Sequence, residues 1–224
     1  EPLTNFYVPV LGAAAAYDRA VGYFNSRELV YAARGVAPFI AGGGTMRLIV
    51  GAELSKPDVD AITRGKPLED VLAATLTADP LGAGVGIVEK YYLELLSYLA
   101  GEGRLQIKVG VPLDTTGQPL TYEQSHKYFH TKYGILTDTA GDKVAFIGSN
   151  NDTGPGWQGN HETFSVYPSW KFEGLLWPEY GAPLEAKFAE LWSGTAMAGW
   201  RTFDLPDAVH QRLIQYAKPG YTPP

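Results

Sequence analysis

A histidine and a lysine separated by one residue form the most reactive pair in this sequence. His130 and Lys132 stand in a β-rich stretch, so both side chains are expected on the same face of one strand. An imidazole near neutral pH can attack phosphorus or protonate a leaving oxygen, and an ammonium group can hold the nonbridging oxygens of a phosphate. The pair therefore predicts a site for phosphate chemistry.

Three polar residues downstream complete the candidate catalytic set. Ser149 and Asn151 follow the apolar run that ends at Gly148, and Glu162 precedes the next β-rich stretch. The amide of Asn151 can hold phosphate oxygens together with Lys132, and the hydroxyl of Ser149 can assist. Glu162 is expected to accept the second ring proton of His130, which would fix the orientation of the imidazole.

The order His-x-Lys and then Gly-Ser-x-Asn resembles the motif of the phospholipase D superfamily. His130, Lys132, Gly148, Ser149 and Asn151 match it, and a glutamate at 162 also resembles the family pattern. The resemblance implies a covalent phosphohistidine intermediate and a site built from two motif copies. This chain carries one copy, so the resemblance implies a homodimer with His130 of one chain as nucleophile and His130 of the other as proton donor.

A wider resemblance covers roughly residues 5–195. These residues resemble the nuclease domain that precedes helicases in bacterial defence and restriction systems, which implies antiviral defence and a helicase as partner. The chain departs from the superfamily at Thr137, where an aspartate is usual, and Asp138 comes one residue later. Because residues 137–142 have a turn-like composition, we predict a structural role for Asp138 and leave it out of the catalytic set.

Three further residues are candidates for contact with substrate, beside Lys132 and Asn151. His126 and Lys127 could form a positive rim, and Trp157 could stack on a base. Each has an ordinary alternative, because polar loops carry such residues for solvation and aromatic rings usually fill cores. An isolated His-x-Lys is itself common, and the downstream motif gives it its weight.

Composition excludes several kinds of site. The chain has no cysteine and only four dispersed histidines, and no Asp/Glu cluster shows ligand spacing, so we expect no metal and no cofactor. The absence of cysteine fits a reducing compartment, and the cytoplasm is the default expectation. No apolar run approaches the ~20 residues of a membrane span. A net charge of −6 argues against a nonspecific nucleic-acid coat but leaves room for a local basic cleft.

Periodicity predicts an α/β fold with a mixed, largely parallel sheet and helices on both faces, as the phospholipase D resemblance also implies. We expect one domain over residues 1–217 and a Pro-rich linker over residues 218–224 that leads toward a helicase domain. The stretch between residues 111 and 126 is expected to be a loop that could cover the site. Strands are predicted at residues 19–24, 46–50, 105–111, 130–136, 144–149 and 163–167, and helices at 26–40, 87–99, 184–192 and 208–216, with others starting near 57 and 67.

The sequence leaves three functions to weigh, of which two are favoured. The first is a metal-independent endonuclease that cleaves DNA. The second is a DNA-binding module that keeps the phosphate pocket and guides a tethered helicase, which the acidic net charge favours. A phospholipase is disfavoured because the chain shows no amphipathic membrane-binding stretch and no basic anchor.

Overall fold

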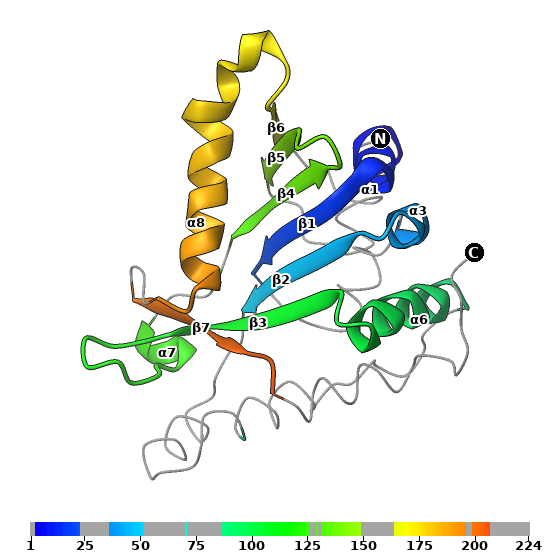
Figure 1. The fold of residues 1–224 in the computed structure, drawn as a ribbon. Coiled ribbons are helices and arrows are strands. Elements are labelled where there is room, and N and C mark those ends of the chain that lie inside the picture. Colours follow the sequence, from blue (N-terminus) through cyan, green and yellow to red (C-terminus); the bar gives the residue numbers. More distant parts are fainter. Residues whose placement is uncertain are drawn as a thin grey trace.

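The computed structural model of the chain describes residues 3–22, 36–51, 70, 87–125, 129, 131–148, 164–195 and 199–206. Within these residues, seven strands form one sheet in the order β6-β5-β4-β1-β2-β3-β7 (Figure 1). The strands are β1 (Ala14–Val21), β2 (Thr45–Gly51), β3 (Leu105–Pro112), β4 (Lys132–Asp138), β5 (Lys143–Gly148), β6 (Phe164–Pro168) and β7 (Trp200–Asp204).

The sheet is mixed, as predicted, with a smaller parallel part than expected. β1, β2 and β3 run parallel to one another, whereas β4, β5, β6 and β7 each pair antiparallel with their neighbours. The reason is the short turn between β4 and β5, which permits only an antiparallel pair, whereas parallel strands need a long crossover. The β-α-β arrangement predicted for the first two strands is confirmed.

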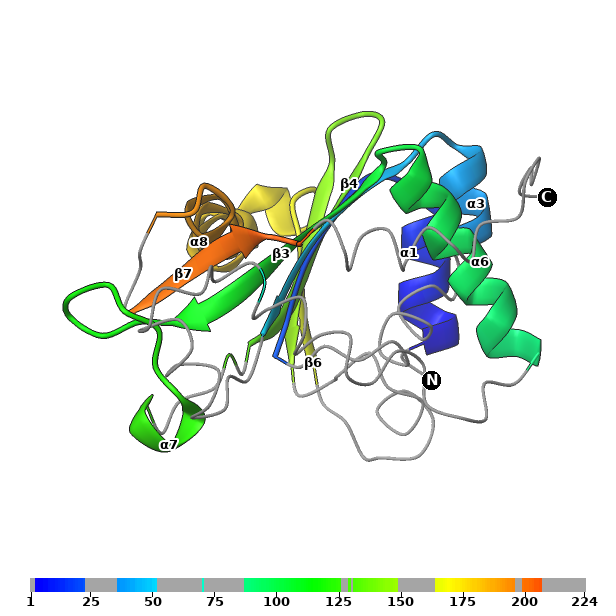
Figure 2. The same cartoon turned by 90° about the horizontal axis from the view of Figure 1, so that it is seen from below.

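Helices cover both faces of the sheet, which confirms the predicted layering (Figure 2). On one face lie η1 (Leu3–Tyr7), α1 (Val8–Ala13), α3 (Val36–Ala41) and α6 (Ile87–Gly101), and we call it the α1 face. The opposite face carries η4 (Trp177–Gly181) and α8 (Ala182–Trp192), and we call it the α8 face. Among the helices that the structure describes, none has the length and apolar character needed to cross a bilayer.

Side chains of the central strand β1 alternate between the two layers. Tyr17 and Val21 belong to the large apolar cluster of the α1 face. Ala20 belongs to the cluster of the α8 face, together with Phe188 and Leu191 of α8. Since successive strand residues point to opposite faces, one central strand serves both cores.

A glycine in β4 makes room for aromatic rings and a buried arginine on the α1 face. A Cβ atom at Gly134 would lie 2.6 Å from the Phe146 ring and 2.9 Å from Cε2 of Tyr17. Arg19 is the register partner of Gly134, is fully buried, and places its guanidinium carbon 5.1 Å from the centroid of the Phe146 ring. A side chain at position 134 would displace this stack.

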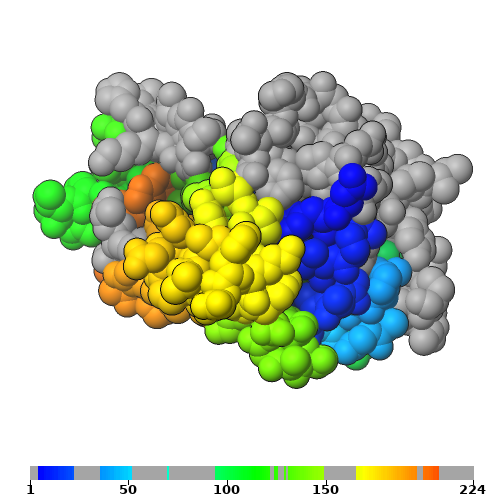
Figure 3. All heavy atoms as spheres, turned by 90° about the horizontal axis from the view of Figure 1, so that it is seen from above, coloured from blue at the N-terminus to red at the C-terminus, as the bar shows by residue number. Residues whose placement is uncertain are grey.

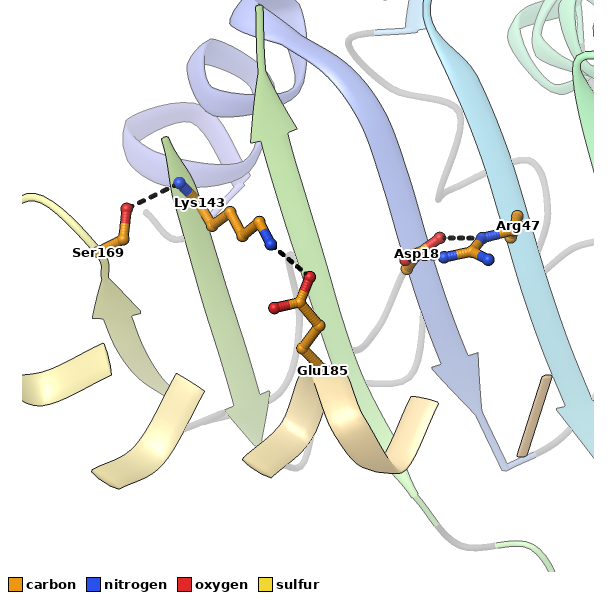
Figure 4. Close-up of polar contacts among 5 residues, drawn as sticks. All are labelled: Asp18, Arg47, Lys143, Ser169 and Glu185. Atoms are coloured by element: carbon orange, nitrogen blue, oxygen red, sulfur yellow. Dashed lines mark hydrogen bonds and ion pairs between the residues drawn. The ribbon is translucent and has the colours of Figure 1, made fainter. Parts of the chain in front are cut away.

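An ion pair and cation–π contacts attach α8 to the α8 face of the sheet (Figure 4). Arg47 donates two hydrogen bonds to Asp18, at 2.7 and 2.6 Å, and this bonding raises the pKa of Arg47 above its ordinary value. Its guanidinium carbon also lies 5.3 Å from the ring centroid of Trp192 in α8. Lys143 of β5 donates a 2.6 Å hydrogen bond to Glu185 of α8. These contacts fix α8 across β1, β2 and β5.

Several predicted elements are confirmed, and others differ. β2, β3, β5, β6, α6 and α8 lie close to their predicted ranges. β1 begins at Ala14, earlier than the predicted residue 19, because pairing with β2 and β4 on its two sides overrides the weak β-propensity of the alanine run. The sequence did not predict η1, α1 or β7. The helices expected near residues 57 and 67 and at 208–216 lie outside the described residues.

The segment after β6 exposes large apolar side chains. Trp170, Phe172, Leu175 and Tyr180 are between 52% and 70% exposed. The segment belongs to the yellow region that dominates the face seen in Figure 3. Ser169 at its start donates its backbone N–H to the carbonyl oxygen of Lys143, so the surface begins at the end of the sheet where β5 starts.

Candidate active site

One edge of the sheet gathers the ends of the strands that flank the candidate residues. The parallel strands β1, β2 and β3 all finish at this edge, with Val21, Gly51 and Pro112 as their last residues. β4 runs in the opposite direction and begins there, with Lys132 paired with Val21. The carboxyl edge of parallel strands is where open α/β sheets generally bind ligands.

The other two motif segments lead to or from the same edge. Tyr133 pairs with Ile147, and Gly148 pairs with Phe164, so β5 ends and β6 begins beside the start of β4. In the sequence Ser149 directly follows Gly148, and Glu162 stands two residues before Phe164. The topology thus brings together the strand ends that carry the three parts of the motif.

Lys132 is the one predicted site residue that the structure describes. It is 5% exposed and pairs with Val21, a member of the α1-face core, so it belongs to the α1 face of β4. A buried ammonium group is costly unless charged or polar groups compensate it. The remaining predicted residues lie outside the described residues: His126, Lys127, His130, Ser149, Asn151, Trp157 and Glu162.

Arg19 is a second buried cation that sequence reasoning missed. It stands on the same face as Lys132, because Arg19 pairs with Gly134 and Val21 with Lys132 in the β1–β4 ladder. The two residues are therefore diagonal neighbours on adjacent strands. The signal in the sequence was a charged residue inside an apolar strand with no polar alternation to explain it. Lys132 and Arg19 are thus two cationic side chains buried on the same face of the sheet, close to the edge where β4 begins.

The predicted loop after β3 is ordered by its own hydrogen bonds. The carboxylate of Asp114 accepts bonds from the backbone N–H of Thr116 at 2.7 Å and of Gln118 at 2.9 Å. The hydroxyl of Thr116 donates a further bond, and these bonds lower the pKa of Asp114. The segment continues into the short helix α7 (Tyr122–Ser125), where Thr121 and Gln124 cap each other reciprocally. It begins at the edge that carries Lys132, and whether it covers the site stays a prediction.

The turn between β4 and β5 is built around Asp138. Its Oδ1 accepts hydrogen bonds from the backbone N–H groups of Ala140 at 2.8 Å and Asp142 at 2.9 Å, and Gly141 has a positive φ of 89°. This turn lies at the end of β4 opposite Lys132. The predicted structural role of Asp138 and the predicted hairpin are confirmed.

Replacement of Asp138 therefore tests a role in folding against a role in catalysis. Asp138→Ala removes two exposed hydrogen bonds and is expected to lower the free energy of unfolding by about 1 kcal/mol. Asp138→Asn keeps an acceptor and should cost less. Urea denaturation measures both, and the rate of phosphodiester cleavage should be unchanged in both. A large loss of cleavage by a folded Asp138→Asn variant would contradict this assignment.

No group of three or more His, Cys, Asp or Glu side chains arranged to hold a metal ion occurs within the described residues.

No family model matches the chain, and no curated protein matches it. Among solved structures it is similar to a phospholipase D family member, Nuc, from Salmonella typhimurium, at 9% sequence identity over 88% of each chain and a TM-score of 0.42.

Proposed function

We propose that this chain is a metal-independent phosphodiesterase that cleaves DNA through a covalent intermediate on His130. One observation carries the proposal: three separate sequence segments with complementary phosphate chemistry adjoin strand ends that meet at a single edge of the sheet. Lys132, the one member of the motif among the described residues, begins β4 at this edge.

The proposed reaction has two displacements at phosphorus. A ring nitrogen of His130 attacks the phosphorus atom, a P–N bond forms, and the P–O bond to the leaving nucleotide breaks while His130 of a second chain donates a proton to the leaving oxygen. Water then attacks the phosphorus atom, gives a proton to that second imidazole, and releases the first. Lys132 and Asn151 stabilise charge on the nonbridging oxygens, Ser149 assists, and Glu162 orients His130.

A homodimer is part of the proposal, because the chain has one copy of the motif and the reaction uses two imidazoles. An isologous contact across the motif edge would place both copies of His130 at one phosphate. We propose that His126, Lys127 and Trp157 contact the nucleic acid around this phosphate, with the positive charge confined to the cleft because the net charge is −6.

The biological setting that we propose is bacterial defence. The resemblance of residues 5–195 to domains that precede helicases supports it. A cytoplasmic location accords with a chain that has no cysteine. The alternative function is a binding module that holds DNA for a helicase without cutting it, which the acidic net charge favours.

The test of the proposal is cleavage of labelled single-stranded and double-stranded DNA in excess EDTA. The purified chain, shown by sedimentation to be a dimer, is expected to nick DNA at a rate that added Mg²⁺ does not raise. DNA affinity without cleavage by the dimer would instead favour the binding module. Cleavage of phosphatidylcholine vesicles with no effect on DNA would identify a phospholipase and overturn the proposal.

A further inference from the structure

Two glycines at the carboxyl edge form a seat for the side chain that precedes His130. Gly51 of β2 and Gly110 of β3 are register partners. A Cβ atom at Gly110 would lie 3.3 Å from Cδ2 of Phe129, and one at Gly51 would lie 2.9 Å from Cβ of Phe129 and collide with the carbonyl oxygen of Gly22. Phe129 is 7% exposed. The Cβ atom of Phe129 therefore lies against the backbone of β2 at Gly51, and its ring lies against the backbone of β3 at Gly110.

Edge strand β7 closes the seat on one side. Trp200 packs edge-to-face on Phe129, with ring centroids 5.4 Å apart, and pairs in register with Pro112 at the end of β3. Phe129 belongs to the α8-face core together with Ile49 and Tyr133. The ring is thus held by β2, β3 and β7, none of which contains a predicted site residue.

We infer that Phe129 is a positioning residue for His130: its side chain, held against the paired glycines, fixes the residue that directly precedes His130 in the sequence. Residues 129–132 are held at both ends. Phe129 is held by the contacts of its side chain, and Lys132 is held by its pairing with Val21 between β4 and β1. His130 lies between these two anchors in the sequence. The inference rests on the proposed function, because it assigns the anchor a role in the reaction of His130.

Truncation of the ring should slow the reaction more than it weakens binding. Phe129→Ala is expected to lower kcat about 10²-fold, because a displacement of about 1 Å in a reacting group has an effect of this size. KM should change little, since the phosphate-binding groups remain. Phe129→Leu should recover most of kcat. The matched control is Phe39→Ala, an equal truncation of a 1%-exposed ring in the α1-face core, which should lower Tm but leave kcat unchanged below the transition.

A double variant separates positioning from stability. The three nearest atoms to a Cβ at Gly110 all belong to Phe129. In the double variant Gly110→Val, Phe129→Ala, the valine side chain therefore occupies space that the phenylalanine ring has left. This variant is expected to regain part of the lost Tm but none of the lost kcat. Recovery of kcat together with Tm, or wild-type kcat in Phe129→Ala, would show that the ring serves packing alone.

A measurement that does not depend on catalysis tests this inference separately from the proposed function. The apparent pKa of His130, followed by NMR and assigned with His130→Gln, should shift in Phe129→Ala and stay unchanged in Phe39→Ala. If the wild-type dimer cuts nothing, the proposed function fails, and this titration still tests whether the ring fixes His130. An unshifted titration in Phe129→Ala would overturn the inference even if the wild-type dimer cuts DNA.

Discussion

Replacement of His130 by alanine is expected to lower the rate of DNA cleavage in EDTA about 10⁴-fold or more, because loss of a covalent nucleophile removes the reaction path itself. The same residue would act twice in the dimer, once as nucleophile and once as proton donor, so the substitution removes both imidazoles. DNA affinity should fall far less, since Lys132 and Asn151 would still hold the phosphate. Steady-state cleavage and fluorescence anisotropy measure the two quantities.

A second histidine provides the control for this experiment. His210 has no assigned role, and His210→Ala should cleave at the wild-type rate. Mixed dimers of wild-type and His130→Ala chains should be inactive, because each site would hold one imidazole and the reaction uses two. Activity proportional to the wild-type fraction would contradict a shared site.

Replacement of Lys132 by methionine is expected to lower kcat by about 10²- to 10³-fold, the usual effect of removing one donor that stabilises charge in a transition state. Methionine has a similar length and suits a position that is 5% exposed, so the fold should tolerate it. Lys132→Arg should retain little activity, because a planar guanidinium is larger than an ammonium group and the side chain at this position is buried. Thermal unfolding and cleavage assays, performed on the same samples, distinguish the two effects.

Lys143 provides the control for the Lys132→Met experiment. It lies on β5 at the opposite end of the sheet, half-exposed and 2.6 Å from Glu185. Lys143→Met should leave kcat unchanged and lower the free energy of unfolding by about 1 kcal/mol or less, as for other exposed ion pairs. Equal losses of kcat in the two variants would mean that Lys132 acts through general charge and not at the site.

The sequence predicted those helices and strands whose hydrophobic pattern can be recognised within the element itself. β2 is a compact apolar run, bounded by glycines, and α8 repeats apolar residues on one helical face, so each could be recognised without its neighbours. β7 could not, because Arg201 and Asp204 interrupt its pattern and Thr202 is its only buried residue. Its strand conformation depends on pairing with β3, which is a tertiary contact.

In the candidate site, too, local features could be predicted from the sequence, whereas features that depend on strand pairing could not. Residue types predicted the chemistry of His130 and Lys132, but the strand predicted from residue 130 begins at Lys132, so strand periodicity does not relate the two side chains. The seat formed by Gly51 and Gly110 depends on the register between β2 and β3, and in the sequence each glycine resembles an ordinary strand end. Arg19 likewise acquires its place beside Lys132 only through the pairing of β1 with β4.

The most direct test of the account is a search for the covalent intermediate. The dimer would be mixed with DNA in excess EDTA, quenched with alkali, digested, and analysed by mass spectrometry for nucleotide attached to the peptide that contains His130. The proposed mechanism predicts a nucleotidyl adduct on His130 that is stable in alkali, is lost in acid, and is absent from His130→Ala. Cleavage that requires a divalent cation and leaves no adduct on His130 would contradict it.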